Sequence, residues 1–419
     1  MKLSQLGGTA LAIFIMLASS CMGRQQPPKV ILEQQPVAYS LPTGVHEVSV
    51  RFKLVNNHVL VPVIINGKGP FDFILDTGMR DPGGILLWQG DWLKDVNLDL
   101  AEGTEAQIGG AGKGQGAVTA QVAEKVQVGI GDIVLRDAHA IVAPPLPVAF
   151  QYHRGVIGGA LLSNFVVTIN YDDSLVTFTE PDHFKSPILW TRVPLTFLSG
   201  IPYVSALLEI NGKENVPATL VVDLGASPPV SLNTEADERI TVPPRHLATE
   251  IGRGVSGVIT GDVARLDALS LGGYILTNVV ATFPDSADQF PRGADSRSGN
   301  LGNGLLHHFN VIFDYGHNRM YITPNRLFDE PFEWRMTGFV LGKATEKGAM
   351  ITRVDESSPA SEMGIEAGDV LLSINGKNVL DYKLEEVRKL TRTAGNKLEL
   401  RLERDGRIST VELTTRQLI

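Results

Sequence analysis

The chain has 419 residues, of which 20% are charged, and a formal net charge of −9 at pH 7. This length is enough for two or three domains of about 100–200 residues each, so we expect a sizeable buried core. The small negative charge and the lack of a Lys/Arg-rich run exclude nucleic acid as the main partner. Short runs of Val, Ile, Leu and Phe between Gly, Pro, Asn and Asp predict a mainly β protein.

Residues 1–20 have the pattern of a secretory signal peptide, with Lys2, an apolar stretch and then small residues. The apolar stretch is too short for the roughly 20 residues that cross a bilayer. The single cysteine, Cys21, follows at once, and the stretch resembles a bacterial lipoprotein signal. That resemblance implies an exported cell-envelope protein, periplasmic or on the outer surface, held to the membrane by lipid on Cys21 and a tether over 21–42. Ordinary cleavage after Ser20 is the alternative.

Three blocks of sequence occur twice in the same order, which predicts an internal duplication. The matching pairs are 64–78 with 209–225, 116–131 with 257–272, and 157–172 with 301–316. In both copies of the first block an apolar strand ends on an aspartate, Asp76 or Asp223. We therefore predict two lobes, 43–183 and 184–328, related by a pseudo-twofold axis. Such an axis would bring Asp76 and Asp223 together at the interface of the lobes.

The Asp-Thr-Gly motif at 76–78, followed by an apolar-apolar-Gly segment at 156–158, resembles the aspartic peptidases. The duplication is similar to the two-lobed pepsin arrangement, and the compact lobes are closer to bacterial retropepsin-like members. The resemblance implies two tandem β-barrel lobes, a polypeptide substrate, catalytic residues Asp76 and Asp223, and neither a cofactor nor a metal. Two close carboxyls of this kind retain one shared proton, so that one activates a water while the other donates to the scissile carbonyl.

The loops around the two aspartates carry further expected roles. Gly78 and Gly225 permit sharp turns, and Thr77 would form a hydroxyl hydrogen bond to the other lobe. The second motif is Asp-Leu-Gly, so Leu224 has no hydroxyl with which to return that bond. Met79 stands where such peptidases have a small residue. These two departures keep a second hypothesis open: a catalytically silent, envelope-anchored protein that binds peptides.

Other motifs in the chain point away from rival chemistries. The glycine-rich segment 108–118 is expected to be a flap hairpin, because Lys113 is followed by glycine and not by the Ser or Thr of a phosphate loop. Ser227 lacks the glycine two residues later that a nucleophile elbow needs. No His-Glu-x-x-His motif occurs, and the adjacent His307 and His308 should face opposite ways on a strand, so no metal site is predicted.

The last part of the chain, 334–419, resembles a PDZ domain. The resemblance rests on Gly364, on Ala-Gly-Asp at 367–369 and on Ile-Asn-Gly at 374–376. The segment 325–334, which contains a proline, is expected to link it to the second lobe.

The sequence 336–341, Met-Thr-Gly-Phe-Val-Leu, matches the loop that holds a peptide carboxylate in PDZ domains. The resemblance implies that the backbone N–H groups of Thr337, Gly338 and Phe339 capture the C-terminus of an extended peptide. The amphipathic segment 382–390 is expected to be the helix that lines the groove. The alternative is a PDZ fold that only packs on the lobes.

Overall fold

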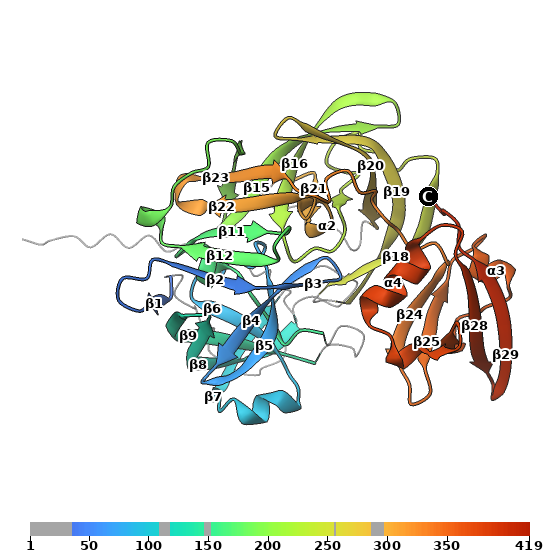
Figure 1. The fold of residues 1–419 in the computed structure, drawn as a ribbon, viewed down its shortest axis with the longest axis horizontal. Coiled ribbons are helices and arrows are strands. Elements are labelled where there is room, and N and C mark those ends of the chain that lie inside the picture. Colours follow the sequence, from blue (N-terminus) through green and yellow to red (C-terminus); the bar gives the residue numbers. More distant parts are fainter. Residues whose placement is uncertain (1–35, 109–117, 146–151, 255–256, 286–296) are drawn as a thin grey trace, which may run out of the picture.

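The computed structural model describes residues 36–108, 118–145, 152–254, 257–285 and 297–419. The predicted signal peptide, Cys21 and the glycine-rich residues 109–117 lie outside these ranges. The described chain is mainly β, with its strands in four sheets, and this confirms the predicted fold class (Figure 1).

The first half of the chain builds a nine-stranded sheet. Its strands are β1 (Ala38–Ser40), β3 (Lys53–Val55), β4 (His58–Ile65), β5 (Lys68–Leu75), β6 (Gly84–Trp88), β7 (Asp99–Ile108), β8 (Val118–Ile130), β9 (Ile133–Ala143) and β10 (Gly155–Ile157). A short 3-10 helix, η1 (Asp91–Asp95), follows β6, and α1 (Gly159–Leu162) follows β10. Strand β5 pairs in parallel with β10, next to the point where β5 ends.

The predicted tether, 21–42, extends too far into the fold. Strand β1 pairs with β9 from Ala38 to Ser40, so ordered structure begins before residue 43. The physical reason is that Val37 is apolar and buried, and its N–H donates to Pro82 O at 2.8 Å.

The second half repeats this plan in an eight-stranded sheet. Its strands are β14 (Thr196–Leu198), β15 (Ile201–Ile210), β16 (Lys213–Asp223), β17 (Val230–Leu232), β18 (His246–Gly254), β19 (Gly257–Leu271), β20 (Tyr274–Pro284) and β21 (Gly299–Gly302). Helix α2 (Asn303–Leu306) follows β21 as α1 follows β10. Strand β16 pairs in parallel with β21, which reproduces the pairing of β5 with β10.

A third sheet of six strands takes members from both halves. Its order is β13 (Thr191–Pro194), β23 (Arg319–Pro324), β22 (Phe309–Asp314), β11 (Val166–Asn170), β12 (Leu175–Thr179) and β2 (Glu47–Arg51). The 3-10 helices η3 (Pro181–His183) and η4 (Tyr315–His317) connect its strands. The halves join where β11 pairs antiparallel with β22, with Thr168 opposite Ile312. Buried residues of both halves form one hydrophobic cluster, so the two halves share a continuous core.

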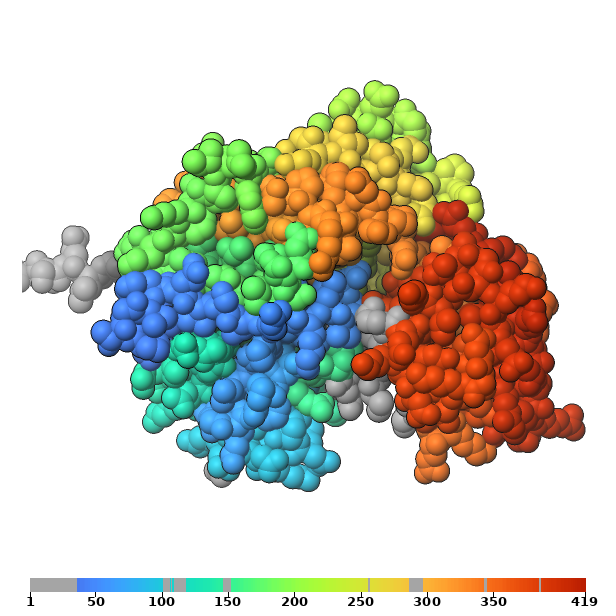
Figure 2. All heavy atoms as spheres, in the orientation of Figure 1, coloured from blue at the N-terminus to red at the C-terminus, as the bar shows by residue number. Residues whose placement is uncertain are grey.

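The C-terminal sheet is a separate body with its own core (Figure 2, red). It contains β24 (Phe339–Ala344), β25 (Ala349–Val354), β26 (Val370–Ile374), β27 (Lys377–Asn378), β28 (Lys397–Arg404) and β29 (Arg407–Thr414). Its helices are α3 (Pro359–Glu362), η5 (Val379–Asp381) and α4 (Leu384–Arg392). Strand β24 pairs only with β25 among the described strands, so it lies at an edge of this sheet.

Strand β18 lies beside the C-terminal sheet (Figure 1). A buried carboxylate joins the two. The fully buried Asp355 side chain accepts a hydrogen bond from Thr249 on β18 at 2.6 Å and pairs with Arg335 at 3.3 Å. Arg353 also pairs with Asp355 and donates to Ala248 O at 2.6 Å. Because these contacts engage β18 backbone and side chain together, they fix the C-terminal body against the edge of the second half.

Candidate active site

Each aspartate is delivered by the same pair of parallel strands in its half of the molecule. Asp76 follows the end of β5, and its N–H donates to Ile157 O on the adjacent strand at 2.9 Å. Asp223 is the last residue of β16 and pairs with Gly302 on β21. The chain then turns sharply, and in the first loop Gly78 N–H donates to Asp76 Oδ1 at 2.7 Å.

The structure brings the two aspartates and both motif glycines together. The carboxyls of Asp76 and Asp223 are hydrogen-bonded to each other, and the N–H of Gly225 donates to both. A Cβ atom on Gly225 would lie 2.6 Å from the Asp76 carboxyl carbon, which is too close. A Cβ atom on Gly78 would lie 3.1 Å from Asp76 Oδ1 and 3.2 Å from Asp223 Oδ1. The absence of side chains at both glycines is therefore what lets the carboxyls meet.

The surroundings of the pair favour one retained proton. Loss of solvation and the neighbouring Asp76 charge together raise the pKa of Asp223 to about 8. Loss of solvation also raises the pKa of Asp76, against the opposing effect of the N–H donors around it. Both residues keep some exposed surface, so a water molecule can reach them. Two such carboxyls cannot both ionise easily, and one proton is shared between them near neutral pH.

The hydroxyl of Thr77 spans the two loops. Thr77 Oγ1 donates to Val222 O at 2.7 Å and accepts from Leu224 N–H at 2.9 Å. The Leu224 side chain is fully buried in the main hydrophobic cluster. The loop of Asp223 is thus held by the hydroxyl of Thr77. Leu224 has no hydroxyl with which to hold the loop of Asp76 in return.

Met79 is accommodated by apolar neighbours. Its side chain packs on a cluster that contains Leu60, Trp88 and Val156. Its N–H is one of the donors that lower the pKa of Asp76. The unusual residue after the first motif therefore leaves the donors around Asp76 in place.

Asn300 is a site residue that sequence reasoning missed. Its Nδ2 donates to Asp223 Oδ2 at 2.8 Å from strand β21. Its counterpart in the first half is Val156, which has no polar group. The sequence did contain a signal for this role, because the position is polar in one copy of the repeat and apolar in the other. This single donor makes the two carboxyls chemically unequal.

The prediction that His307 and His308 face opposite ways on a strand is wrong. Both lie in the turn between α2 and β22, with ring centroids 4.5 Å apart, because the strand begins only at Phe309. Each Nδ1 makes a hydrogen bond to a backbone carbonyl oxygen, Asn303 O at 2.7 Å and Leu327 O at 2.6 Å.

One group of side chains in the described residues has the composition of a metal site: His46, Glu180 and His183. The two imidazoles stack face to face, with centroids 3.6 Å apart and planes 7° apart. Their in-plane nitrogen lone pairs therefore run side by side and do not converge on one point. Glu180 already accepts hydrogen bonds from Tyr39 at 2.9 Å and from His46 at 2.7 Å. This arrangement is that of a stacked histidine pair on a shared carboxylate.

The loop before β24 lies where the sequence predicts peptide capture. Its carbonyls are engaged, since Thr337 O accepts from Ala360 N–H at 2.9 Å and Gly338 O from Asp355 N–H at 2.7 Å. Gly338 has a φ of 84°, which favours glycine. Within the described residues, the N–H groups of Thr337 and Gly338 donate to no backbone carbonyl oxygen. Phe339, the third predicted residue, begins the edge strand β24 and is buried.

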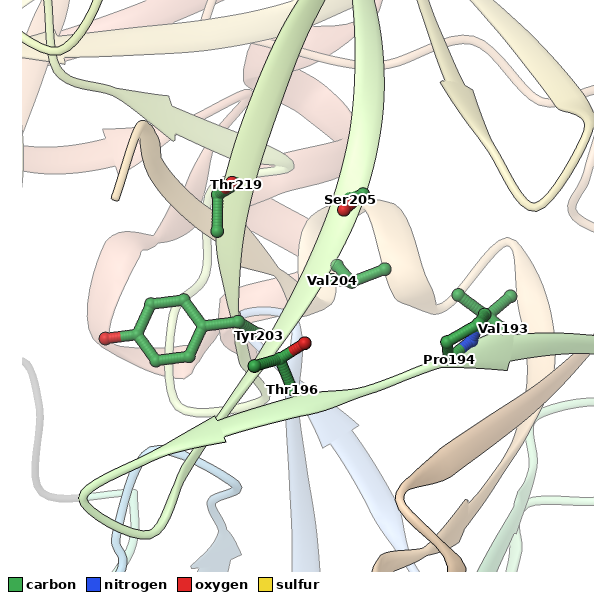
Figure 3. Close-up of a pocket in the computed structure, with 7 residues that line it drawn as sticks. All are labelled: Val193, Pro194, Thr196, Tyr203, Val204, Ser205 and Thr219. Atoms are coloured by element: carbon green, nitrogen blue, oxygen red, sulfur yellow. The ribbon is translucent and has the colours of Figure 1, made fainter. Parts of the chain in front are cut away.

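A small hollow in the second half lies apart from both aspartate loops (Figure 3). It has a volume of about 130 Å³. Val193 and Pro194 line one side and Tyr203 and Thr219 the other. It contains none of the predicted site residues and is too small for an extended peptide.

Comparisons with known protein families agree with this geometry. A family profile described as aspartyl protease matches residues 206–306, which include Asp223. A profile described as PDZ domain matches residues 350–404 in the C-terminal sheet. The chain therefore contains an aspartyl protease domain and a C-terminal PDZ domain.

Similar curated proteins share a short stretch with this chain. The periplasmic serine endoprotease DegP of Salmonella typhimurium is 36% identical over 72 residues, which is 17% of this chain and 15% of that protein. DegP of Escherichia coli strain K12 is 38% identical over 72 residues, with the same two shares. A probable periplasmic DegP-like endoprotease of Brucella suis is 36% identical over 75 residues, 18% of this chain and 14% of that protein. The chain thus matches only about a seventh of the length of these relatives. In the part of the chain that is described, no helix has the length and apolar character to cross a membrane.

Proposed function

We propose that this protein is an aspartic endopeptidase in which Asp76 and Asp223 activate a water molecule. The observation that carries the proposal is the hydrogen-bonded carboxyl pair, supplied by equivalent strands of the two halves. The deprotonated member takes a proton from the water, which attacks the scissile carbonyl carbon. The protonated member donates to the carbonyl oxygen, and the proton later passes to the leaving amine. Asn300, as a donor to Asp223 Oδ2, opposes part of the rise in the pKa of that carboxyl.

A serine mechanism is disfavoured by the contacts of the candidate Ser–His pair. Ser227 Oγ lies 3.2 Å from His58 Nε2 but donates its proton to Asn56 O at 2.7 Å. His58 Nε2 also lies 2.9 Å from Gly225 O, a carbonyl that can only accept. That nitrogen therefore carries hydrogen and cannot be the base for Ser227. The DegP relatives are serine endoproteases by name, but the matched 72 residues are close in size to a PDZ domain, and we infer that the likeness lies there.

Cleavage of a broad peptide library tests the mechanistic class. We expect the wild type to cleave peptides in the presence of an organophosphorus reagent that phosphorylates active serines. Asp76→Asn should lose the activity, because asparagine cannot cycle a proton. Asp72→Asn is the matched control, since Asp72 lies on β5, the strand that leads to Asp76, and its carboxylate pairs with the exposed Lys53. Inactivation by the serine reagent would refute the proposal.

The second candidate function is a silent peptide-binding protein. Leu224 favours it, because the second loop lacks the hydroxyl of the first. In that case the wild type would cleave nothing at any pH, while peptides would still bind between the halves with an affinity unchanged by Asp76→Asn.

We further propose that the PDZ domain captures peptide C-termini and so recruits substrates or partners. The support is the edge position of β24 together with the Thr337 and Gly338 N–H groups in the preceding loop. A bound peptide would add a strand to β24 while its carboxylate meets these donors. Calorimetry of the full chain with free-acid and amidated forms of one peptide tests this. Equal affinity for both forms would refute carboxylate capture and leave a PDZ fold that only packs on the lobes.

We also propose that the protein is exported and anchored in the cell envelope through lipid on Cys21. The support is the lone cysteine after a signal-like segment and the periplasmic location in the names of the relatives. Wild type should partition into detergent after cell fractionation, and Cys21→Ser should be released. Equal release of both proteins would refute the lipid anchor.

A further inference from the structure

The loop that carries Asp223 is held by a hairpin turn from the other half of the molecule. This turn, residues 56–58, joins β3 to β4. Its contacts are His58 Nε2 to Gly225 O at 2.9 Å, Asn57 Nδ2 to Ser227 O at 2.9 Å, and Ser227 Oγ to Asn56 O at 2.7 Å. Asn56 and Asn57 have φ angles of 54° and 59°, as a two-residue hairpin turn of this kind requires, and asparagine tolerates them.

The central contact depends on one tautomer of His58. Because Gly225 O can only accept, Nε2 carries the hydrogen. The other ring nitrogen, Nδ1, then accepts from Tyr152 OH at 2.7 Å. Gly225 O thus sets the tautomer, and Tyr152 OH accommodates it by donating to Nδ1. The residue that receives this bond, Gly225, is the one whose N–H donates to both Asp76 and Asp223.

A second set of hydrogen bonds, made by Asn303, holds the same loop. Asn303, at the start of α2, is fully buried, and its N–H donates to Ala226 O at 2.8 Å. Its side-chain Nδ2 donates to Asn57 O at 2.7 Å, and its Oδ1 accepts from Tyr171 OH at 2.5 Å. Asn303 therefore connects the Asp223 loop to both the 56–58 turn and the core of the first half.

In the described residues, the first aspartate loop shares the backbone part of this support but not the side-chain part. Gly159 N–H donates to Met79 O at 2.7 Å, as Asn303 N–H donates to Ala226 O, and glycine has no side chain to reach the facing turn. The corresponding turn of the second half is Ser199–Gly200, between β14 and β15, with φ angles of 50° and 78°. In the described residues, the side chain of the exposed Arg80 reaches this turn and donates to Ser199 O at 3.2 Å. The support from the 56–58 turn adds to that of Thr77, whose hydroxyl bonds the backbone on both sides of Asp223. By the symmetry of the repeat, a hydroxyl at residue 224 would instead reach the loop of Asp76. The Asp223 loop is thus held by two sets of contacts from the first half.

We propose that the 56–58 turn, with His58 as its main donor, is a positioning element that works together with Thr77 to hold Asp223 against Asp76. The proposed effect on catalysis rests on the aspartic peptidase function proposed above. The positioning itself does not. Burial lowers the pKa of His58 to about 4, so the donating neutral ring persists through mildly acidic pH.

Substitutions at His58 test the proposal in the full-length protein. His58→Leu removes the donor to Gly225 O, and His58→Gln keeps a side-chain N–H donor of similar reach. We expect His58→Leu to lower kcat on the order of tenfold or more with little change in KM, because only the geometry of the reacting groups is disturbed. His58→Gln should retain most of kcat.

His153→Leu is the matched control. His153 lies in the same half, is equally buried, and bonds to Gly155 O instead of an aspartate loop. It should leave kcat near wild type. Equal kcat for His58→Leu and His153→Leu would overturn the proposal.

A thermal unfolding cycle separates this proposal from the peptidase proposal. If the wild type cleaves no peptide, the peptidase function fails, and the midpoints of His58→Leu, Thr77→Val and the double variant still decide the positioning role. We expect the shifts of His58→Leu and Thr77→Val to be non-additive, because both side chains hold the Asp223 loop, and those of His153→Leu and Thr77→Val to add. Additive shifts in both pairs would overturn the positioning role.

Discussion

Thr77 Oγ1 lies 2.7 Å from Val222 O and 2.9 Å from the N–H of Leu224, so one hydroxyl from the first half holds the backbone on both sides of Asp223. The contact is buried and crosses between the halves. Asp223 is thus fixed by Thr77 on one side and by the 56–58 turn on the other.

Thr77→Val should therefore damage both stability and activity. The substitution keeps the shape but leaves Leu224 N–H buried without an acceptor, at a cost of about 1–3 kcal/mol. The control is Thr282→Val, since Thr282 is equally buried but makes only a long hydrogen bond of 3.4 Å to Val230 O. Chemical denaturation measures both variants, and an equal loss of unfolding free energy would contradict the role given to Thr77.

The stability of the fold should be highest near pH 6.5. Burial lowers the pKa of His58, His153 and His307 to about 4, so the folded state favours their neutral forms. Their contribution is complete above the unfolded pKa of about 6.5 and is lost as the pH falls toward 4. The raised pKa of Asp223 acts in the opposite sense, because its protonated form is favoured in the folded state. That contribution is lost as the pH rises through about 8.

Thermal unfolding from pH 4 to 9 checks this dependence. The midpoint should rise from pH 4 to 6.5, because three histidines outweigh one carboxyl, and then fall toward pH 8. In Asp223→Asn the decline above pH 6.5 should be weaker, because the titrating group is gone. A decline of equal size in this variant would show that other groups cause it.

Asp355→Ala should weaken the docking of the PDZ domain on β18. The substitution would leave Arg335 and Arg353 near β18 without their buried partner, and breaking a buried pair in this way costs about 3–5 kcal/mol. The control is Glu403→Ala, which removes a partner of the exposed Lys347 and should cost about 1 kcal/mol or less. Differential scanning calorimetry should resolve two transitions in Asp355→Ala. One transition with only the loss seen for Glu403→Ala would contradict the docking role.

The repeat predicted the mainly β fold and the meeting point of the aspartates, because matched blocks fold alike and an approximate twofold axis brings equivalent residues together. It did not predict the sheet shared by both halves. The pairing of β11 with β22 joins residues more than a hundred positions apart, and each strand alone reads only as an apolar segment.

The residues that reasoning from the sequence missed lie where the two copies differ. Asn300 and Asn303 replace Val156 and Gly159 of the first copy. His58 follows the β3–β4 turn, and its partner is a backbone carbonyl from the other half, for which no sequence pattern exists. A repeat defines what the halves share, whereas the support of Asp223 depends on what they do not share.

The most direct test of the shared proton is the pH dependence of peptide hydrolysis by wild type and Asp223→Asn, with circular dichroism to verify the fold. The account predicts a bell-shaped kcat/KM profile for the wild type, with activity through neutral pH and a basic limb near pH 8, where the pair loses its last proton. It predicts no detectable hydrolysis by Asp223→Asn at any pH. Hydrolysis by folded Asp223→Asn at a rate near that of the wild type would contradict it.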